Sequence, residues 1–199
     1  MNDKENVTIG RPKEGGAIFF APAGTTLPTS ASEELSEAFV CLGYVTEDGV
    51  TESVSEEGDD IVAWGPEDVM HSQTSYGKTL TLNLLETAKP AVLQFVYGKD
   101  NVTVNEDGSL KWRDTGKILP RGVFIVDTLH NNGSDNPRVH RKVYGDCQFV
   151  DRSGDHTYNN SDPLSFPVVM KAYKFTDSDG VKDYSIDYMT AATETSSES

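Results

Sequence analysis

The sequence is short of basic residues. Its 199 residues include 17 Lys and Arg against 32 Asp and Glu, which gives a formal net charge of -15. A protein that reads nucleic acid usually presents a basic surface, so this composition argues against such a role. It does not argue against a wall that nucleic acid passes without binding.

Long apolar runs and cysteines are also scarce. No apolar run approaches the roughly 20 residues of a membrane-spanning helix, so we expect no membrane segment. The polar start, Met1 to Lys13, lacks the apolar stretch of a secretory signal, and we expect a chain made in a reducing cytoplasm. Cys41 and Cys147 are then expected to be buried apolar side chains and not a disulfide framework.

The charge is unevenly distributed along the chain. No Lys or Arg occurs between Lys13 and Lys78, whereas basic residues cluster at 111–121 and 138–142. This polarity suggests a surface complementary to another copy, and the alternative is an acidic loop folded onto the chain's own basic half. The candidate residues of a subunit interface or a lumen wall are Glu52, Glu56, Glu57, Asp59, Asp60, Trp64, Arg113, Arg121, Arg138, Arg141 and Lys142.

Tryptophan is rare, with Trp64 and Trp112 as its two positions. Packing in a core or against a sheet is the ordinary explanation for such residues. Trp64 is also a candidate anchor at a subunit interface, because tryptophan is enriched where interfaces bury most of their energy.

The chain divides into three parts by composition. Residues 1–16 are polar, contain several glycines, and are expected to form an N-terminal arm. Residues 17–189 are expected to form a single domain with an acidic hairpin loop at about 46–76, whose tip is Glu56–Asp60. Residues 190–199 are rich in Ser, Thr and Glu and are expected to be a disordered C-terminal tail.

Most of the domain has the pattern of short β-strands. Thr79–Leu84 alternates cleanly, which predicts Leu80, Leu82 and Leu84 on one buried face. Val123–Val126 is apolar on both faces and predicts a central strand. Many short strands separated by turns are typical of a β-sandwich or a partly closed barrel.

Two helices are predicted among these strands. The longer spans about residues 87–97, with a proline in its first turn and a glycine directly after its end. The shorter spans about residues 32–39, because Ser30 and Glu33 fit a capping box and apolar residues follow at helical spacing.

No catalytic or metal-binding pattern is present. The four histidines lie outside the known nucleophile and zinc-peptidase motifs, and no glycine-rich phosphate loop follows a strand. Asp177-x-Asp179-Gly180 partly resembles a calcium loop but lacks the residues that complete an EF-hand, and a hairpin turn explains it. We therefore predict no enzyme, no cofactor and no metal.

The order of several short segments resembles a known family. In chain order they are Leu27–Thr29, Ala38–Val50, Ile61–Gly65, Leu84–Thr87, Phe95–Gly98 and Phe166–Tyr173. This succession, over about Gly15 to Tyr188, is similar to the major tail proteins (tail tube subunits) of long, non-contractile-tailed bacteriophages, or siphoviruses, that infect actinobacteria.

The resemblance implies a fold and an assembly. The fold would be a tail-tube-type β-sandwich or partly closed barrel with one flanking α-helix and a short N-terminal helix. The subunits would form hexameric rings that stack around a tape-measure protein, between a tail terminator and baseplate or tip proteins. Double-stranded DNA would later pass through the lumen without specific binding. Because residues 1–16 and the acidic hairpin have little apolar content, we also expect them to order only when rings stack.

The resemblance also implies a location. The protein would be made in the host bacterial cytoplasm and would belong to the tail of the virion. One alternative is a related tube protein of a contractile tail, a prophage particle or a type VI-like secretion device. Another is a soluble β-sandwich module that binds a carbohydrate or a protein.

Overall fold

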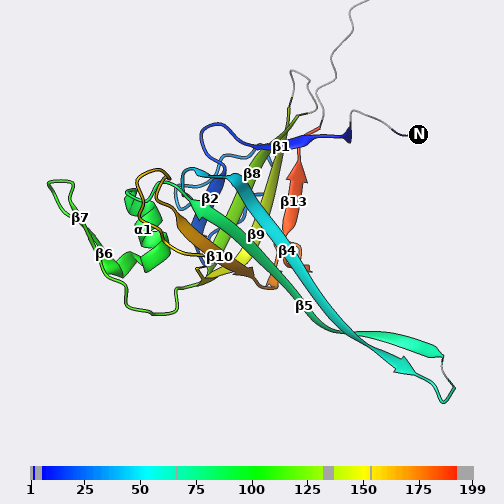
Figure 1. Cartoon of the computed structure of the whole chain (residues 1–199). Coiled ribbons are helices and arrows are strands. Elements are labelled where there is room, and N and C mark those ends of the chain that lie inside the picture. The colour runs from blue at the N-terminus through cyan, green and yellow to red at the C-terminus, as the bar shows by residue number, and fades with distance from the viewer. Residues whose placement is uncertain (1, 3–5, 66, 132–136, 153, 192–199) are drawn as a thin grey trace, which may run out of the picture.

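The fold is mainly β, as predicted. The computed structural model describes residues 2, 6–65, 67–131, 137–152 and 154–191. A nine-stranded antiparallel sheet has the order β3-β2-β8-β9-β10-β5-β4, with β1 added to β8 and β13 added to β9 (Figure 1). Its strands are β1 (Ile9–Pro12), β2 (Ile18–Pro22), β3 (Val40–Cys41), β4 (Val45–Val62), β5 (Asp68–Leu84), β8 (Gly122–Asn131), β9 (Arg138–Asp151), β10 (Phe166–Ala172) and β13 (Ile186–Met189).

The sheet is open, and two small hairpins accompany it. Among the described residues the end strands β3 and β4 pair with no further strand, so the sheet is not closed into a barrel. One hairpin joins β6 (Val102–Val104) to β7 (Leu110–Trp112), as its Asn-Glu-Asp-Gly turn predicts. The other joins β11 (Phe175–Thr176) to β12 (Lys182–Asp183) around the Asp-Ser-Asp-Gly turn.

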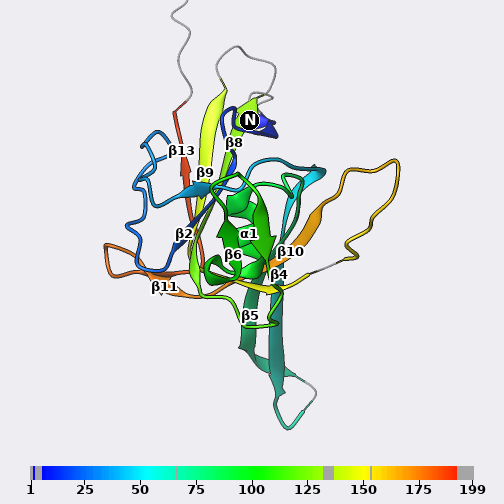
Figure 2. The same cartoon turned by 90° about the vertical axis from the view of Figure 1, so that its left-hand side faces the viewer.

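The main core lies between the sheet and the helix α1 (Pro90–Tyr97), which crosses one face of the sheet in Figure 2. Leu80, Leu82 and Leu84 are buried on the same face of β5, as the alternation predicts. Leu93 and Val96 of α1 pack into the same cluster and are themselves almost wholly buried. The prediction of strand phase is therefore confirmed.

The central strand β8 contributes to two cores. Phe124 belongs to the cluster beneath α1, whereas Val123 and Ile125 belong to a second cluster on the other face. Phe39 and Leu35, from the segment before β3, cover this second cluster. Apolar residues on both faces of β8 thus reflect a strand that is covered on both sides.

The helix α1 begins at Pro90 and ends before Gly98, close to its predicted bounds. Pro90 occupies the first turn, where its missing N–H costs nothing. Gly98 has φ 91°, and its N–H donates to the carbonyl of Gln94 at 2.9 Å. A 3-10 helix, η2 (Lys99–Asn101), follows. Within the described residues, no helix is long and apolar enough to cross a membrane.

The predicted short helix at residues 32–39 is wrong, because this segment forms turns and bends. The capping contacts exist: Glu33 donates its N–H to Ser30 Oγ at 3.1 Å, and the carboxylate of Glu33 accepts the N–H of Thr29. The carbonyls of Ser30 and Glu33, which a helix would need, instead accept hydrogen bonds from Arg141. A tertiary contact therefore replaces the helical hydrogen bonds.

The ends of the chain are partly outside the described residues. Within the predicted arm, Ile9–Pro12 form β1 and pair with β8. In the predicted tail, Thr190 exchanges hydrogen bonds with Val139, and residues 192–199 lie outside the described part. Cys147 is buried and Cys41 is half-buried, and neither is in a disulfide.

Candidate assembly surface

A long β-hairpin leaves the body of the molecule. Strands β4 and β5 pair along nearly their whole length, up to the pair Val62–Asp68. The third strand, β10, pairs with β5 only from Leu84 to Lys78. Beyond Lys78 the hairpin therefore consists of two strands, and it extends away from the sheet in Figure 1. We call residues 53–77 the hairpin arm.

The acidic residues lie along this arm and not at its tip, which corrects the predicted hairpin. Glu56, Glu57, Asp59 and Asp60 belong to strand β4, which pairs with β5 up to Val62–Asp68, so the chain reverses only beyond Val62. Gly58, which suggested a turn, instead marks a register shift. A side chain there would overlap the imidazole of His71, since a Cβ would lie 2.5 Å from its Nε2.

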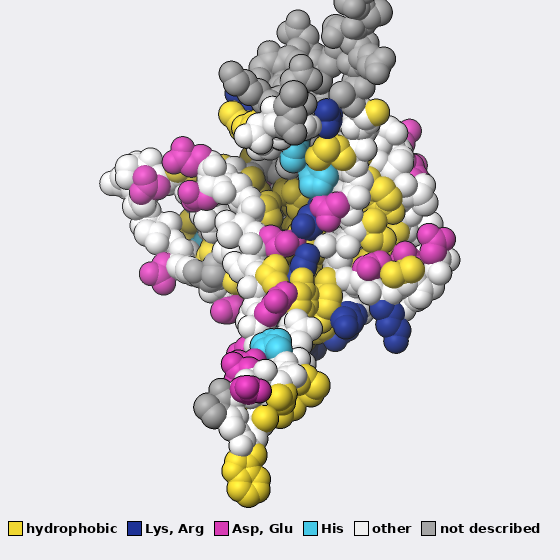
Figure 3. Space-filling model, turned by 90° about the vertical axis from the view of Figure 1, so that its right-hand side faces the viewer, with side chains coloured by type: hydrophobic (Ala, Val, Ile, Leu, Met, Phe, Trp, Pro, Cys, Tyr) yellow, Lys and Arg dark blue, Asp and Glu magenta, His cyan; other side chains and the backbone are white. Residues whose placement is uncertain are grey.

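The acidic side chains of the arm have few partners. Asp60 lies 2.6 Å from Nδ1 of His71, and Glu57 accepts a hydrogen bond from Ser75 at 3.2 Å. Within the described residues, Glu56 and Asp59 have no side-chain partner. Figure 3 shows the arm in space-filling form, with acidic side chains along it and hydrophobic side chains at its end.

The end of the arm is apolar. Trp64 is fully exposed there, which excludes packing in the core of its own chain. Its neighbours Ile61, Val62, Val69 and Met70 are each about half exposed or more. A cluster of large exposed apolar side chains usually marks an interaction site. The role of Trp64 as an interface anchor stays a prediction.

Glu52 holds the root of the arm to the body. Its carboxylate accepts the hydroxyl of Tyr144 at 2.5 Å and lies 3.0 Å from Nζ of Lys142 and 3.3 Å from Nζ of Lys78. Partial burial opposes ionisation of Glu52, but these hydrogen bonds and charges outweigh it and lower its pKa. Burial, and then the Glu52 carboxylate, raise the pKa of Tyr144. Glu52 is therefore engaged within its own chain.

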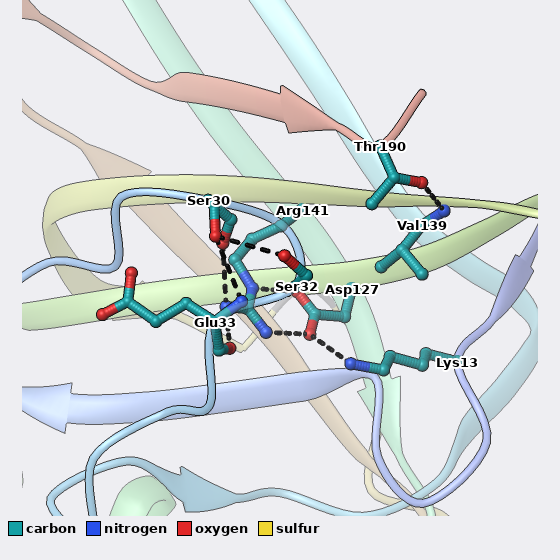
Figure 4. A network of polar contacts seen from close by, with 8 residues as sticks. All are labelled: Lys13, Ser30, Ser32, Glu33, Asp127, Val139, Arg141 and Thr190. Atoms are coloured by element: carbon teal, nitrogen blue, oxygen red, sulfur yellow. Dashed lines mark hydrogen bonds and ion pairs between the residues drawn. The ribbon is translucent and has the colours of Figure 1, made fainter. Parts of the chain in front are cut away.

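Arg141 is likewise engaged within the chain. Its guanidinium binds both oxygens of the Asp127 carboxylate, at 2.8 and 2.7 Å, and also the carbonyls of Ser30 and Glu33 (Figure 4). Lys13 lies 3.7 Å from the same carboxylate. Because Arg141 and Asp127 are 1 % exposed, neither presents surface to a neighbouring copy.

The other basic candidates differ in availability. Arg121 pairs with Asp146 at 2.8 Å and lies over the ring of Tyr173. Arg113 is exposed and Arg138 is half-buried, and neither has an ion pair within the described part of the chain. Among the described residues, Glu52 and Lys142 are the only two candidate interface residues that form an ion pair with each other within one subunit.

Among the described residues, no three His, Cys, Asp or Glu side chains come together as a group that could hold a metal ion. Burial raises the pKa of the Cys147 thiol, so it stays protonated and unreactive. The distinctive features are an extended arm, its unpaired carboxylates and its apolar end.

The comparison with protein families gives the context of these features. Residues 1–194 match the family described as phage tail tube protein. The chain belongs to this family. It is therefore a structural component of a phage tail, and tail tube proteins assemble into a multimeric tube. The comparison with curated proteins gave no match.

The sequence analysis did not predict two side-chain contacts of this tail tube protein. The Arg141–Asp127 pair joins strands β8 and β9, and the carbonyls it orients lie more than 100 residues earlier in the chain. The Tyr144–Glu52 contact spans a similar distance. No local pattern signals either contact, although buried charge in an apolar strand such as β8 could have drawn attention to Asp127.

Proposed function

We propose that this tail tube protein forms stacked hexameric rings in the tail of a non-contractile-tailed phage of actinobacteria. The observation that supports this most directly is the hairpin arm. It extends away from the body and ends in exposed apolar side chains around Trp64, and beyond Lys78 no third strand of the described residues pairs with it. Such a segment is explained by a binding surface on another subunit.

An arm of this kind favours head-to-tail assembly. A protruding end and its receptor are different surfaces of the same molecule, so the contact is heterologous. Heterologous contacts make closed rings or open-ended filaments, and a tube contains both. In this proposal the N-terminal arm, residues 1–16, gains contacts with the next ring when rings stack, in addition to the pairing of β1 with β8.

The proposal extends to the partners of the tube, which are DNA and the other tail proteins. With a net charge of -15, the subunits repel phosphate groups, so double-stranded DNA can pass through the lumen without binding it. A tape-measure protein would fill the lumen before DNA, and a tail terminator and baseplate or tip proteins would close the two ends. The assembled protein would be located in the virion.

Electron microscopy of the purified protein tests the proposal. Rings or tubes are expected as the protein concentration rises. A matched variant replaces residues 56–76 by an Asn-Gly turn, which keeps the hairpin pairs through Ser55–Gly77 and the contacts of Glu52. It should fold, as judged by circular dichroism, but stay monomeric. A full-length protein that remains a monodisperse monomer at high concentration would contradict the proposal.

A further inference from the structure

A pocket lies beside α1, away from the hairpin arm. Its volume is about 440 Å³, within the range of pockets that hold a large aromatic or drug-sized group. Val96 and Tyr97 of α1 form one wall, Phe149 of β9 and Arg152 directly after this strand form another, and the loop 114–119 forms the third. In Figure 1 α1 and the end of the arm lie at opposite sides of the molecule.

The loop of this pocket is anchored to the body at two points. Gln148 donates to the carbonyl of Leu119 at 2.7 Å, and Arg152 donates to the carboxylate of Asp114 at 3.0 Å. Between the anchors, Ile118 is 88 % exposed. The pocket therefore has a fixed frame and an apolar side chain at its rim that its own subunit leaves uncovered.

The charged residues that line the pocket are of both signs, namely Asp114, Lys117, Asp151 and Arg152. Lys117 is one of these lining residues, and Lys111 of β7 and Arg113, directly after β7, precede the loop in the sequence. These three side chains are exposed and have no ion pair within the described residues. The guanidinium of Arg152 lies 5.3 Å from the centre of the Tyr97 ring, so both a cation and an aromatic face are present in the wall.

We propose that this pocket receives Trp64 of a second copy of the chain, an inference that rests on the proposed tube assembly. The end of the arm is apolar and aromatic, as the pocket requires, and an indole in the pocket can contact the faces of Tyr97 and Arg152. The arm behind Trp64 carries the carboxylates of Glu56 and Asp59, and Lys117 at the pocket has no ion pair within the described residues. The acidic arm and the exposed Lys117 are complementary in charge.

The alternative receptor predicted from sequence, residues 138–142, fits less well. Arg141 is buried against Asp127, and Lys142 binds Glu52 and Asp187 of its own chain. Lys117, which lines the pocket, has no ion pair within the described residues. Because Trp64 and the pocket lie on opposite sides of one subunit, the contact joins two subunits head to tail.

Tryptophan fluorescence tests the contact in the full chain. The substitution Trp112→Phe leaves Trp64 as the sole tryptophan. Its emission should shift to shorter wavelength when the protein assembles, because the indole leaves water. Adding Ile118→Asp should abolish this shift. The control Val181→Asp changes another exposed apolar residue, in the β11–β12 turn, and should leave the shift intact.

Disulfide trapping identifies the pocket directly. In a chain with Cys41→Ser and Cys147→Ala, the pair Trp64→Cys with Ile118→Cys should give intermolecular disulfides on oxidation of the assembled protein. The matched pair Trp64→Cys with Val181→Cys should not. Assembly of these chains is checked by electron microscopy, and the same trapping is repeated on mixtures of the two single-cysteine chains.

The outcomes separate this inference from the proposed function. Tubes in which Trp64 keeps the emission of an exposed indole, or in which the Ile118 pair is trapped no better than the Val181 pair, would overturn the pocket contact and leave the tube intact. A full chain that forms no rings or tubes would overturn both. A blue shift with selective trapping at Ile118 supports both.

Discussion

The guanidinium of Arg141 faces the carboxylate of Asp127 directly across strands β9 and β8, through two hydrogen bonds of 2.8 and 2.7 Å. The pair is buried, and its remaining donor capacity fixes the carbonyls of Ser30 and Glu33. It thereby connects the central strands to the segment that covers the second core.

Replacing Arg141 should destabilise the subunit strongly. Arg141→Met leaves Asp127 buried without its main partner, and breaking a buried pair on one side costs about 3–5 kcal/mol. Urea denaturation should show a lower midpoint. The double variant Arg141→Met with Asp127→Leu removes both charges and should recover much of the loss. A single variant as stable as the parent would mean that the pair contributes little.

Leu82→Ala should also lower the free energy of unfolding, by about 2–5 kcal/mol, because it opens a cavity in the core beneath α1. Leu82 is 2 % exposed and lies opposite Val168 in the sheet. Val69→Ala is the control on the same strand, since Val69 is 60 % exposed. Thermal melting of the two variants should differ clearly. Equal melting temperatures would contradict the burial of Leu82.

Lowering the pH should destabilise the folded chain, and part of this loss should depend on His130. This side chain lies 3.2 Å from Thr8 Oγ1, next to β1, and its ring contacts that of His140, which Asp187 binds on its other side. Burial, and then His140, lower the pKa of His130, so the fold favours its neutral form. The contribution of the neutral ring to the free energy of unfolding is complete above the pKa of His in the unfolded chain, about 6.5. It is lost as the pH falls below this pKa.

The measurement compares melting temperatures of the parent and His130→Gln from about pH 7.5 to about pH 5. The parent should lose more stability over this range, because Gln does not titrate. Parallel profiles for the two proteins would show that His130 does not link protonation to folding.

Charge reversal on the arm should slow assembly without unfolding the subunit. Glu56→Lys with Glu57→Lys changes side chains that are exposed and have weak contacts. Light scattering should show slower polymerisation at low salt and a smaller difference at high salt, because ions screen exposed charges beyond about 8–10 Å. Adding Arg113→Glu with Lys117→Glu should restore part of the rate.

A control reversal, Glu34→Lys with Glu37→Lys, changes exposed acidic side chains on the body. It should leave the rate closer to that of the parent. If the arm reversal has no effect at any salt concentration, the arm carboxylates do not lie at an interface.

The sequence predicts this fold best where burial imposes a period. The alternation at 79–84 and the apolar run at 123–126 correctly indicate the phase of β5 and the central place of β8. The hairpin arm has no buried face, so no apolar period marks its strands. The Glu-Glu-Gly-Asp-Asp sequence then suggested a turn, although Gly58 makes room for His71 within a strand.

The remaining errors arise from contacts between distant residues. The local signals of a helix start at Ser30 and Glu33 are present, and their hydrogen bonds form. Arg141, about 110 residues later, competes for the carbonyls and prevents the helix. Glu52 and Arg141 likewise bind residues that are far away in the sequence. Charge patterning alone therefore predicts them at a surface, although both are engaged inside the subunit.

The two-stranded arm has open edges on both sides, because β4 ends the sheet and β5 has lost β10 beyond Lys78. The unpaired strand edges of free subunits can form non-specific β-sheet hydrogen bonds with one another. The carboxylates of β4 oppose such pairing by mutual repulsion, as charged residues do on natural edge strands. This repulsion would therefore keep unassembled subunits dispersed until the end of a growing tube provides a binding surface for the arm. Replacing these carboxylates by valine should yield amorphous or fibrous aggregates in place of ordered tubes.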